Sequence, residues 1–379
     1  MAPWRLGGSP PKTKHPLHLR SGIPLAPLTT LRIGGAARRM ADLESEDDVA
    51  AAVREADARG EPLFVLGEGS NVVVGDEGFP GLVARMAIPG IHAERAGDRV
   101  TVDVGAGEGW DAFVTRCVGE GWRGVECLGG IPGRVGATPI QNVGAYGQEV
   151  GESIVSVRVF DRTRGRFSTM DAAACGFGYR ASVFKRSDRW IVTRVRFAFD
   201  RSGESVPLRY AELVRALGVR DGDRAPAHRV RETIVALRRT KGMVVSADDP
   251  DSVSAGSFFV NPVVDAAAVA RVEAAAGERP PRFDAGEGRH KLAAAWLVER
   301  AGFPKGWGSG RAGVSRKHAL ALVNRGGATA RELLACARAI RDGVRSRFGV
   351  TLEPEPVFVG CVWDEPTGGS GEEHGHQGE

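Results

Sequence analysis

The chain has 379 residues, of which 42% are hydrophobic, and a formal net charge of +4. This length allows two or three domains with sizeable cores, and no stretch approaches the ~20 apolar residues of a membrane span. No Lys/Arg stripe is interleaved with aromatic residues, so nucleic acid is not an expected partner. We therefore expect no membrane insertion, and the modest positive charge suits an anionic small ligand.

The two ends of the chain and its cysteines indicate which segments fold and in which compartment the protein works. Residues 1–27 are basic and rich in proline, without the apolar segment of a secretory signal. Residues 364–379 are too polar to fold, so we expect a disordered arm and a disordered tail. The five cysteines are scattered and form no CxxC pair, which predicts no disulfide framework, no metal site and a reducing cytoplasm.

The first predicted elements alternate with a short glycine loop. Residues 28–40 have the composition of a turn region, and residues 45–59 predict a helix capped by Ser45. Apolar runs at 62–66 and 72–74 predict strands around the loop 67–71, GEGSN. This order is not the strand–loop–helix of a dinucleotide-binding unit, and the loop is not a P-loop. Its N–H groups suit phosphate oxygens, although a purely structural turn fits the same residues.

A longer glycine-rich segment follows a predicted strand at 99–105 and a predicted helix from Trp110 to about Val118. It runs from Gly129 to Gly147 with the sequence GGIPGRVGATPIQNVGAYG. Its spacing of glycine and proline excludes a helix or strand of ordinary length. Because it is also apolar, we expect a buried or half-buried loop whose backbone lies against another group. A tight turn without any ligand is the alternative.

The remaining elements predict an α+β fold. Alternating residues at 154–160 and 190–199 predict antiparallel strands of a meander. After Leu208 the chain becomes rich in amphipathic helices, and a second, α/β unit is expected. Its predicted elements are helices within 208–218, 228–242, 291–302 and 329–349 and a strand within 318–326.

Several stretches together resemble one family, the UDP-N-acetylenolpyruvoylglucosamine reductases. They occur in the family's order across residues 28–361. No single stretch is decisive, but GSFFVNP and PIQNVGAYG are specific, and the whole set is more so. The stretches are LGEGSNVVV (66–74), GAGEGW (105–110), IPGRVGATPIQNVGAYG (131–147), FGYRASVFK (177–185), AGSFFVNP (255–262), KLAAAWLVERAG (291–302) and LEPEP (352–356).

The resemblance implies a domain plan. The family has a two-part FAD-binding domain of the vanillyl-alcohol-oxidase (PCMH) type, here expected at 28–91 and 92–240. A smaller α/β substrate-binding domain is expected at 241–354, and residues 355–363 are expected to return to the active site. No histidine occurs between His92 and His228, which agrees with non-covalent FAD.

The resemblance also implies an activity. Members use NADPH and FAD to reduce UDP-N-acetylglucosamine enolpyruvate to UDP-N-acetylmuramate in peptidoglycan precursor synthesis. The expected protein is a cytoplasmic monomer. Two rivals are another FAD-dependent oxidoreductase of the same superfamily, acting on a sugar or lactone, and a nucleotide-binding module without chemistry.

Family positions map onto individual residues of this chain. Arg180 is expected to stabilise negative charge beside the substrate carboxylate, because its guanidinium can bind a carboxylate with two donors. Ser257 is expected to donate a proton, and Glu355 to assist it, with Glu353 as the competing glutamate. From the residues alone, each also has a structural reading: an Arg on Tyr179, a capping serine, an edge carboxylate.

Two further sets are implied. Members with the substrate-covering tyrosine often carry Arg two residues after the catalytic glutamate, where this chain has Val357. One phosphate contact is therefore either absent or supplied from elsewhere, for instance by Arg238 or Arg239. The implied FAD-binding residues are Gly67, Glu68, Gly69, Ser70, Asn71, Gly133, Thr138, Gln141, Asn142, Gly144, Ala145 and Tyr146. The implied substrate-binding residues are Tyr210, Lys241, Asn261 and Lys291.

Overall fold

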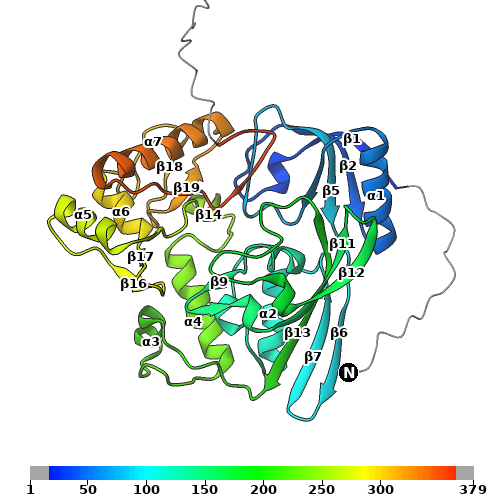
Figure 1. The fold of residues 1–379 in the computed structure, drawn as a ribbon, viewed down its shortest axis with the longest axis horizontal. Coiled ribbons are helices and arrows are strands. Elements are labelled where there is room, and N and C mark those ends of the chain that lie inside the picture. The colour runs from blue at the N-terminus through cyan, green and yellow to red at the C-terminus, as the bar shows by residue number, and fades with distance from the viewer. Residues whose placement is uncertain (1–16, 364–379) are drawn as a thin grey trace, which may run out of the picture.

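The computed structural model describes residues 17–363, which form an α+β fold of several small sheets around one large antiparallel sheet (Figure 1). The predicted tail at 364–379 and the first 16 residues of the predicted arm lie outside this range. Elements from distant parts of the sequence meet in the middle of the molecule, where the glycine-rich loops run. That arrangement positions the candidate site.

The first sheet has the strand order β1-β2-β5-β3. Its strands are β1 (Arg20–Pro24), β2 (Ala36–Leu43), β5 (Phe79–Met86) and β3 (Leu63–Leu66). β1 is antiparallel to β2, whereas β2 and β3 both run parallel to β5. Helix α1 (Glu46–Ala58) begins at Ser45, whose hydroxyl accepts a hydrogen bond from Asp48 N, as the sequence predicts.

The second sheet is antiparallel, with the order β12-β11-β13-β7-β6 and β8 paired to β13. The long strand β13 (Trp190–Arg201) lies at its centre. Helix α2 (Trp110–Gly119) follows β7 and packs against the sheet. The other strands are β6 (Ile91–Ala96), β7 (Arg99–Gly105), β8 (Trp122–Arg123), β11 (Ile154–Asp161) and β12 (Arg166–Asp171), with the small hairpin β9 (Gly144–Ala145) and β10 (Gln148–Glu149) nearby.

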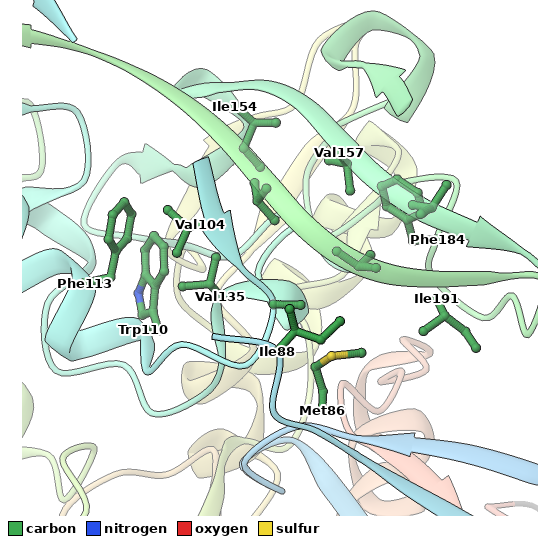
Figure 2. Packing of buried hydrophobic residues seen from close by; sticks show 14 of the residues in the cluster. Met86, Ile88, Val104, Trp110, Phe113, Val135, Ile154, Val157, Phe184 and Ile191 are labelled. Carbon is green, nitrogen blue, oxygen red and sulfur yellow. The ribbon is translucent and has the colours of Figure 1, made fainter. Parts of the chain in front are cut away.

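One hydrophobic core joins these two sheets. It contains buried residues of β2, α1 and β5 together with those of α2 and the large sheet. Figure 2 shows Trp110 and Phe113 side by side at one side of this core, with their rings tilted by 51° to each other, and Met86 and Ile88 at the point where the first sheet leads into the second. Val135, within the long glycine-rich segment, is fully buried in the same core, so that loop is anchored rather than free.

Helices α3 (Ala211–Leu217) and α4 (Ala227–Thr240) form a separate apolar cluster against Cys127. They therefore associate with the end of the large sheet and not with the elements that follow. Among residues 17–363, six short 3-10 helices connect other elements: Ala26–Leu28, Glu126–Leu128, Val135–Ala137, Val150–Glu152, Ala172–Cys175 and Pro250–Ser252.

The third group of elements packs around helix α7 (Ala330–Phe348), which begins with a complete capping box between Thr329 and Glu332. Its cluster of buried residues also includes Leu31 and Ile33 from the start of the chain. The other elements are β14 (Ser254–Ser257), β19 (Ala321–Asn324), β18 (Ala312–Val314), β15 (Val263–Val264), β17 (His290–Leu292), β16 (Arg282–Asp284), α5 (Ala266–Ala276) and α6 (Ala294–Arg300).

After α7 the chain returns to the first sheet. Strand β20 (Val357–Val359) pairs in parallel with β4 (Val72–Val74), directly after the loop at 67–71. This pairing carries the segment that contains Glu355 from one side of the molecule to the other (Figure 1). The terminal glutamates therefore lie beside a loop that is almost 300 residues earlier in the sequence.

Two expectations about local structure are wrong, and three strands were not anticipated. Residues 17–27 of the predicted arm are ordered, because β1 pairs with β2 and Leu25 is fully buried. Residues 36–40 of the predicted turn region belong to β2, where Arg39 is held between Glu55 and Glu61. Strands β5, β6 and β12 were not anticipated. β12 comes between the two predicted meander strands in the sequence, but in the sheet it lies at the edge and pairs with the first of them, β11.

Candidate active site

A cavity of about 980 Å³ lies between the large sheet, the first sheet and the third group of elements. Its wall contains the loop 67–71, most of the segment 131–146, and side chains from residues 180–191 and 238–257. Arg180, Ser257 and Glu355 all line it. The structure thus brings together in one cavity three residues that are far apart in the sequence.

The loop 67–71 presents free backbone donors to this cavity. Within residues 17–363, the N–H groups of Glu68, Gly69, Ser70 and Asn71 donate to no protein acceptor. Gly69 has φ of +68°, and a Cβ there would stand 2.2 Å from the carbonyl oxygen of Leu28, so the tight path of the loop requires glycine. Consecutive free N–H groups at a cavity wall suit a ligand with several acceptor oxygens, such as a diphosphate.

Side chains of this loop brace it against the second glycine-rich segment. The Glu68 carboxylate accepts a hydrogen bond of 2.9 Å from Gly133 N. The Ser70 hydroxyl donates one of 3.0 Å to the carbonyl oxygen of Pro132. The two glycine-rich stretches therefore form one continuous wall, and these two side chains hold the wall together.

Most of the other expected cofactor residues lie on the same wall, and one does not. Asn142 is only 2% exposed, and its amide donates to Glu149 Oε2 at 2.7 Å and to the Gly178 carbonyl at 3.1 Å. Its side chain thus fixes the loop instead of lining the cavity. The remaining residues on the wall are Gly67, Gly133, Thr138, Gln141, Gly144, Ala145 and Tyr146.

Arg180 and Glu355 form an ion pair on the cavity wall. Arg180 Nε lies 3.3 Å from Glu355 Oε1, and Arg180 Nη2 donates to the Gly144 carbonyl at 2.8 Å. Arg180 has φ of +51°, a strained backbone for a residue with a side chain, and Lys185 Nζ donates to its carbonyl oxygen at 2.7 Å. The guanidinium therefore has a fixed position beside the glycine-rich wall.

The structure distinguishes between the two terminal glutamates. The Glu355 side chain is 12% exposed, whereas that of Glu353 is 62% exposed and lies 3.8 Å from Arg186 near the surface. Burial raises the pKa of Glu355, while Arg180, Lys185 and the hydrogen bond from Gln141 act in the opposite direction. Raised pKa values beside a charge partner in a cavity are typical of functional carboxylates.

Ser257 is the last residue of β14 and lines the cavity. Its hydroxyl has no hydrogen-bond partner among the residues that the structure describes. A half-buried serine whose hydroxyl caps no helix and binds no backbone is available to a ligand. The capping role that the sequence left open for Ser257 does not occur.

Tyr210 and Lys241 lie at another part of the cavity wall, beside Tyr146. The rings of Tyr146 and Tyr210 meet edge to face with centroids 5.3 Å apart, and Lys241 Nζ is 5.6 Å from the Tyr146 centroid. Lys241 also forms an ion pair of 2.5 Å with Glu212. Burial raises the pKa of Tyr146 to about 12, so its hydroxyl is a neutral donor.

Asn261 and Lys291 are not on this cavity wall. Asn261 Oδ1 accepts a hydrogen bond from Ala294 N at the start of α6, and Asn261 lines a neighbouring cavity. Lys291 Nζ lies 4.1 Å from the Tyr179 ring centroid and 5.8 Å from that of Phe283. In this arrangement the two residues connect the third group of elements to the segment that carries Arg180.

The position at Val357 is apolar and 49% exposed, on the cavity wall. Of the two arginines that could supply a contact in its place, Arg238 lines the cavity and Arg239 does not. Arg238 donates to the carbonyl oxygens of Gly130 at 3.3 Å and Met243 at 2.7 Å. Its guanidinium is therefore a positive charge held in place by backbone oxygens.

Sequence reasoning missed His318, which also lines the cavity. Its Nδ1 accepts a hydrogen bond of 3.1 Å from Leu320 N. Burial and the nearby charges of Lys241, Lys305 and Arg238 lower its pKa to about 4. The ring is thus neutral near pH 7 and carries its proton on Nε2. A histidine next to an apolar strand gave no signal, because it also fits a core position.

His318 should make the stability of the protein sensitive to acid. Its folded pKa of about 4 lies below the ordinary 6.5, so the unfolded chain takes up a proton first as the pH falls. Its contribution to stability is complete above pH 6.5 and is lost towards pH 4. Urea unfolding of wild type and His318→Gln at pH 7 and pH 4.5 checks this. Between these two pH values the free energy of unfolding should fall by up to about 2 kcal/mol more in wild type than in the variant. Equal decreases in the two proteins would contradict this.

The cavity passes a simple test of fit for FAD. Its free N–H groups match a diphosphate, and the glycine-rich wall next to them lets a flat ring approach the backbone closely. The Arg180–Glu355 ion pair places one positive and one negative side chain at the same wall. Among residues 17–363 no group of His, Cys, Asp and Glu could hold a metal ion. The fold and the site define the class as a flavin-dependent oxidoreductase.

Comparisons with known proteins agree with this class. Residues 37–171 match the FAD binding domain family, and residues 249–359 match the C-terminal domain of UDP-N-acetylenolpyruvoylglucosamine reductase. The reductase of Thermobifida fusca (strain YX) is 52% identical over 347 residues, covering 90% of this chain and 98% of its own. That of Salinispora arenicola (strain CNS-205) is 51% identical over 359 residues, covering 93% and 99%.

A solved structure extends the comparison to the fold. The crystal structure of UDP-N-acetylenolpyruvylglucosamine reductase from Thermus caldophilus superposes with a TM-score of 0.60 at 26% identity, covering 90% of this chain and 98% of that one. The chain belongs to the UDP-N-acetylenolpyruvoylglucosamine reductase family. Within the described residues, none of the helices combines the length and apolarity that crossing a membrane requires.

Proposed function

We propose that the protein uses NADPH and FAD to reduce UDP-N-acetylglucosamine enolpyruvate to UDP-N-acetylmuramate, a step of peptidoglycan precursor synthesis in cell wall biogenesis. Family membership supports the reaction. The observation that carries it is the joint position of Arg180, Ser257 and Glu355 on one cavity wall with the free N–H groups of residues 68–71. A cofactor diphosphate and a reacting carboxylate would then have separate partners.

When bound, FAD takes two electrons from NADPH and supplies them as hydride to the β-carbon of the enolpyruvyl group. The Glu68–Asn71 N–H groups would hold its diphosphate. Arg180 would bind the substrate carboxylate and offset the negative charge that reaches it from the α-carbon. A proton delivered to that α-carbon completes the reduction of the double bond to a lactyl ether.

Ser257 would donate this proton from its hydroxyl. A serine is a weak acid, so it serves only against a strongly basic carbon and with help from nearby charge. Its hydroxyl is free of protein partners in the described residues, which leaves it available to the substrate. Glu355, buried and paired to Arg180, would assist this transfer and position the reacting group.

Five residues would hold the nucleotide sugar. Tyr210 and Lys241 are near Tyr146 on the cavity wall, where a ring and a cation could cover a diphosphate. Arg238, held by backbone oxygens on the same wall, would supply the positive charge that Val357 lacks. Asn261 and Lys291 would reach the substrate only after the third group of elements adjusts, since they line other surfaces here.

We further propose that the protein works as a monomer in the cytoplasm. The walls of the cavity come from a single chain, so no partner subunit is needed to complete them. The five cysteines are free thiols, which is consistent with a reducing compartment.

The purified protein should be yellow and should consume NADPH only when UDP-N-acetylglucosamine enolpyruvate is present. Flavin absorbance would exclude a nucleotide-binding module without chemistry, and the dependence on the enolpyruvyl nucleotide would exclude an oxidase of sugars or lactones. UDP-N-acetylglucosamine is the matched control, because it lacks only the reacting group. Protein that stays colourless after refolding with FAD would refute the proposal.

A further inference from the structure

A chain of side-chain amides connects Glu355 to the loop at 67–71. Asn71 Nδ2 donates to Gln141 Oε1 at 3.3 Å, and Gln141 Nε2 donates to Glu355 Oε1 at 3.1 Å. Asn71 Nδ2 also donates to the backbone carbonyl oxygen of Glu355 at 3.3 Å. Both amides come from stretches that the sequence assigned to the cofactor, yet in the structure their polar atoms meet the terminal glutamate.

The backbone carbonyl fixes the direction of the whole chain. A carbonyl oxygen can only accept, so the Asn71 amide must turn its nitrogen towards Glu355. Gln141 must then present its oxygen to Asn71, which leaves its nitrogen facing the Glu355 carboxylate. The alternative amide rotamers would set two donors or two acceptors against each other. The orientation of Gln141 therefore follows from a backbone atom that cannot change its role.

This network distinguishes the two carboxylate oxygens of Glu355. Oε1 accepts a hydrogen bond of 3.1 Å from Gln141 Nε2 and lies 3.3 Å from Arg180 Nε in an ion pair. A hydrogen-bond donor and a positive charge at the same oxygen both oppose its protonation. Within residues 17–363, Oε2 has no hydrogen-bond partner. The charged groups that act on this carboxylate are Arg180 and Lys185, and Tyr179 is a titratable neighbour.

We propose that Gln141 is a positioning residue for Glu355. Its amide directs Oε1 of Glu355 to Arg180, and Oε2 is left as the oxygen that faces the reacting group and exchanges its proton. This inference rests on the proposed function, because it concerns the carboxylate of that reaction. It gives the segment 131–147 a second task beside enclosing the cofactor. Asn71 sets the direction of the Gln141 amide.

Gln141→Met tests the proposal, since it keeps the size of the side chain and removes the donor. Reduction of the enolpyruvyl nucleotide should fall about ten- to hundredfold, the usual effect of losing a hydrogen bond to a charged group. The acidic limb of its pH profile should move to higher pH, because the lost donor favoured the ionised carboxylate. FAD content and the rate of flavin reduction by NADPH should stay within about twofold, as expected if Gln141 acts through Glu355 rather than through the cofactor.

A double-mutant cycle identifies the partner through which Gln141 acts. In a Glu355→Gln background, Gln141→Met should cost less than about threefold, because the carboxylate that it orients is gone. A loss of tenfold or more in that background, an unmoved acidic limb, or a loss of bound FAD would each overturn the proposal. If wild type fails to reduce the nucleotide at all, the proposed function fails instead, and the two failures are distinguishable.

A readout without turnover completes the test. The carboxyl carbon of Glu355, labelled with carbon-13 and assigned by its absence in Glu355→Gln, should titrate at higher pH in Gln141→Met than in wild type. Gln148→Met is the matched control: Gln148 is buried, and its side chain accepts a hydrogen bond from Cys127 N at 2.8 Å and is not part of the hydrogen bonds that join Asn71, Gln141 and Glu355. It should leave the Glu355 titration unchanged, and equal shifts in the two variants would contradict the proposal.

Discussion

Replacing Ser257 with alanine should slow reduction of the enolpyruvyl nucleotide by about 10²–10⁴-fold, the range usual for loss of a general acid. The hydroxyl has no protein partner in the described residues, so its removal breaks no hydrogen bond of the fold. We therefore expect nearly unchanged stability and FAD content. Stopped-flow measurement of the two half-reactions checks this: reduction of the flavin by NADPH should continue, and transfer to the substrate should fail.

The neighbouring Ser254 is the control for this substitution. It is buried on the same strand, and its hydroxyl accepts a hydrogen bond of 3.2 Å from Gly256 N. Ser254→Ala should therefore affect stability modestly and leave the ratio of the two half-reactions unchanged. Comparable loss in both half-reactions of Ser257→Ala would mean that the residue supports the cavity and does not deliver a proton.

Much of the site could be predicted because it depends on residue types with few alternative uses. Free N–H groups at residues 68–71 follow from a glycine loop that neither a helix nor a sheet can use. Arg180, in an aromatic, glycine-flanked stretch, was assigned an anionic partner by the family resemblance, and in the structure it lies beside both Glu355 and the ring of Tyr179. His318, Lys185 and the Gln141 network could not be predicted, because their importance comes from neighbours distant in the sequence.

The errors in the fold have a similar physical origin. β1 contains glycine and proline and its side chains are mostly exposed, so no alternation marks it as a strand. β6 is an exposed edge strand with the sequence IHAERA, in which only Ile91 is partly buried. Both strands are stabilised by pairing with a neighbour rather than by their own apolar pattern. Helix α1 was predictable because its cap and its buried face are both local.

Changing Glu355 to glutamine should reduce transfer to the substrate about 10²–10⁴-fold, whereas Glu353→Gln should cost less than about threefold. Glu353 and Glu355 are two positions apart and carry the same carboxylate, so the two substitutions form a matched pair. Glutamine in place of Glu355 keeps an oxygen for Arg180 and Gln141 but removes the negative charge and the exchangeable proton. Arg180 and Lys185 would then lack their shared anion in a half-buried site.

Glu353 has none of these partners. Its carboxylate is 62% exposed and lies 3.8 Å from an Arg186 side chain that is 73% exposed. Such surface pairs contribute little. Burial raises the pKa of Glu355, so wild-type transfer should decline in mild acid while the small residual rate of Glu355→Gln stays flat. Equal losses in the two variants, or a greater loss in Glu353→Gln, would place the assisting carboxylate at the surface and leave the buried network around Glu355 without a catalytic role.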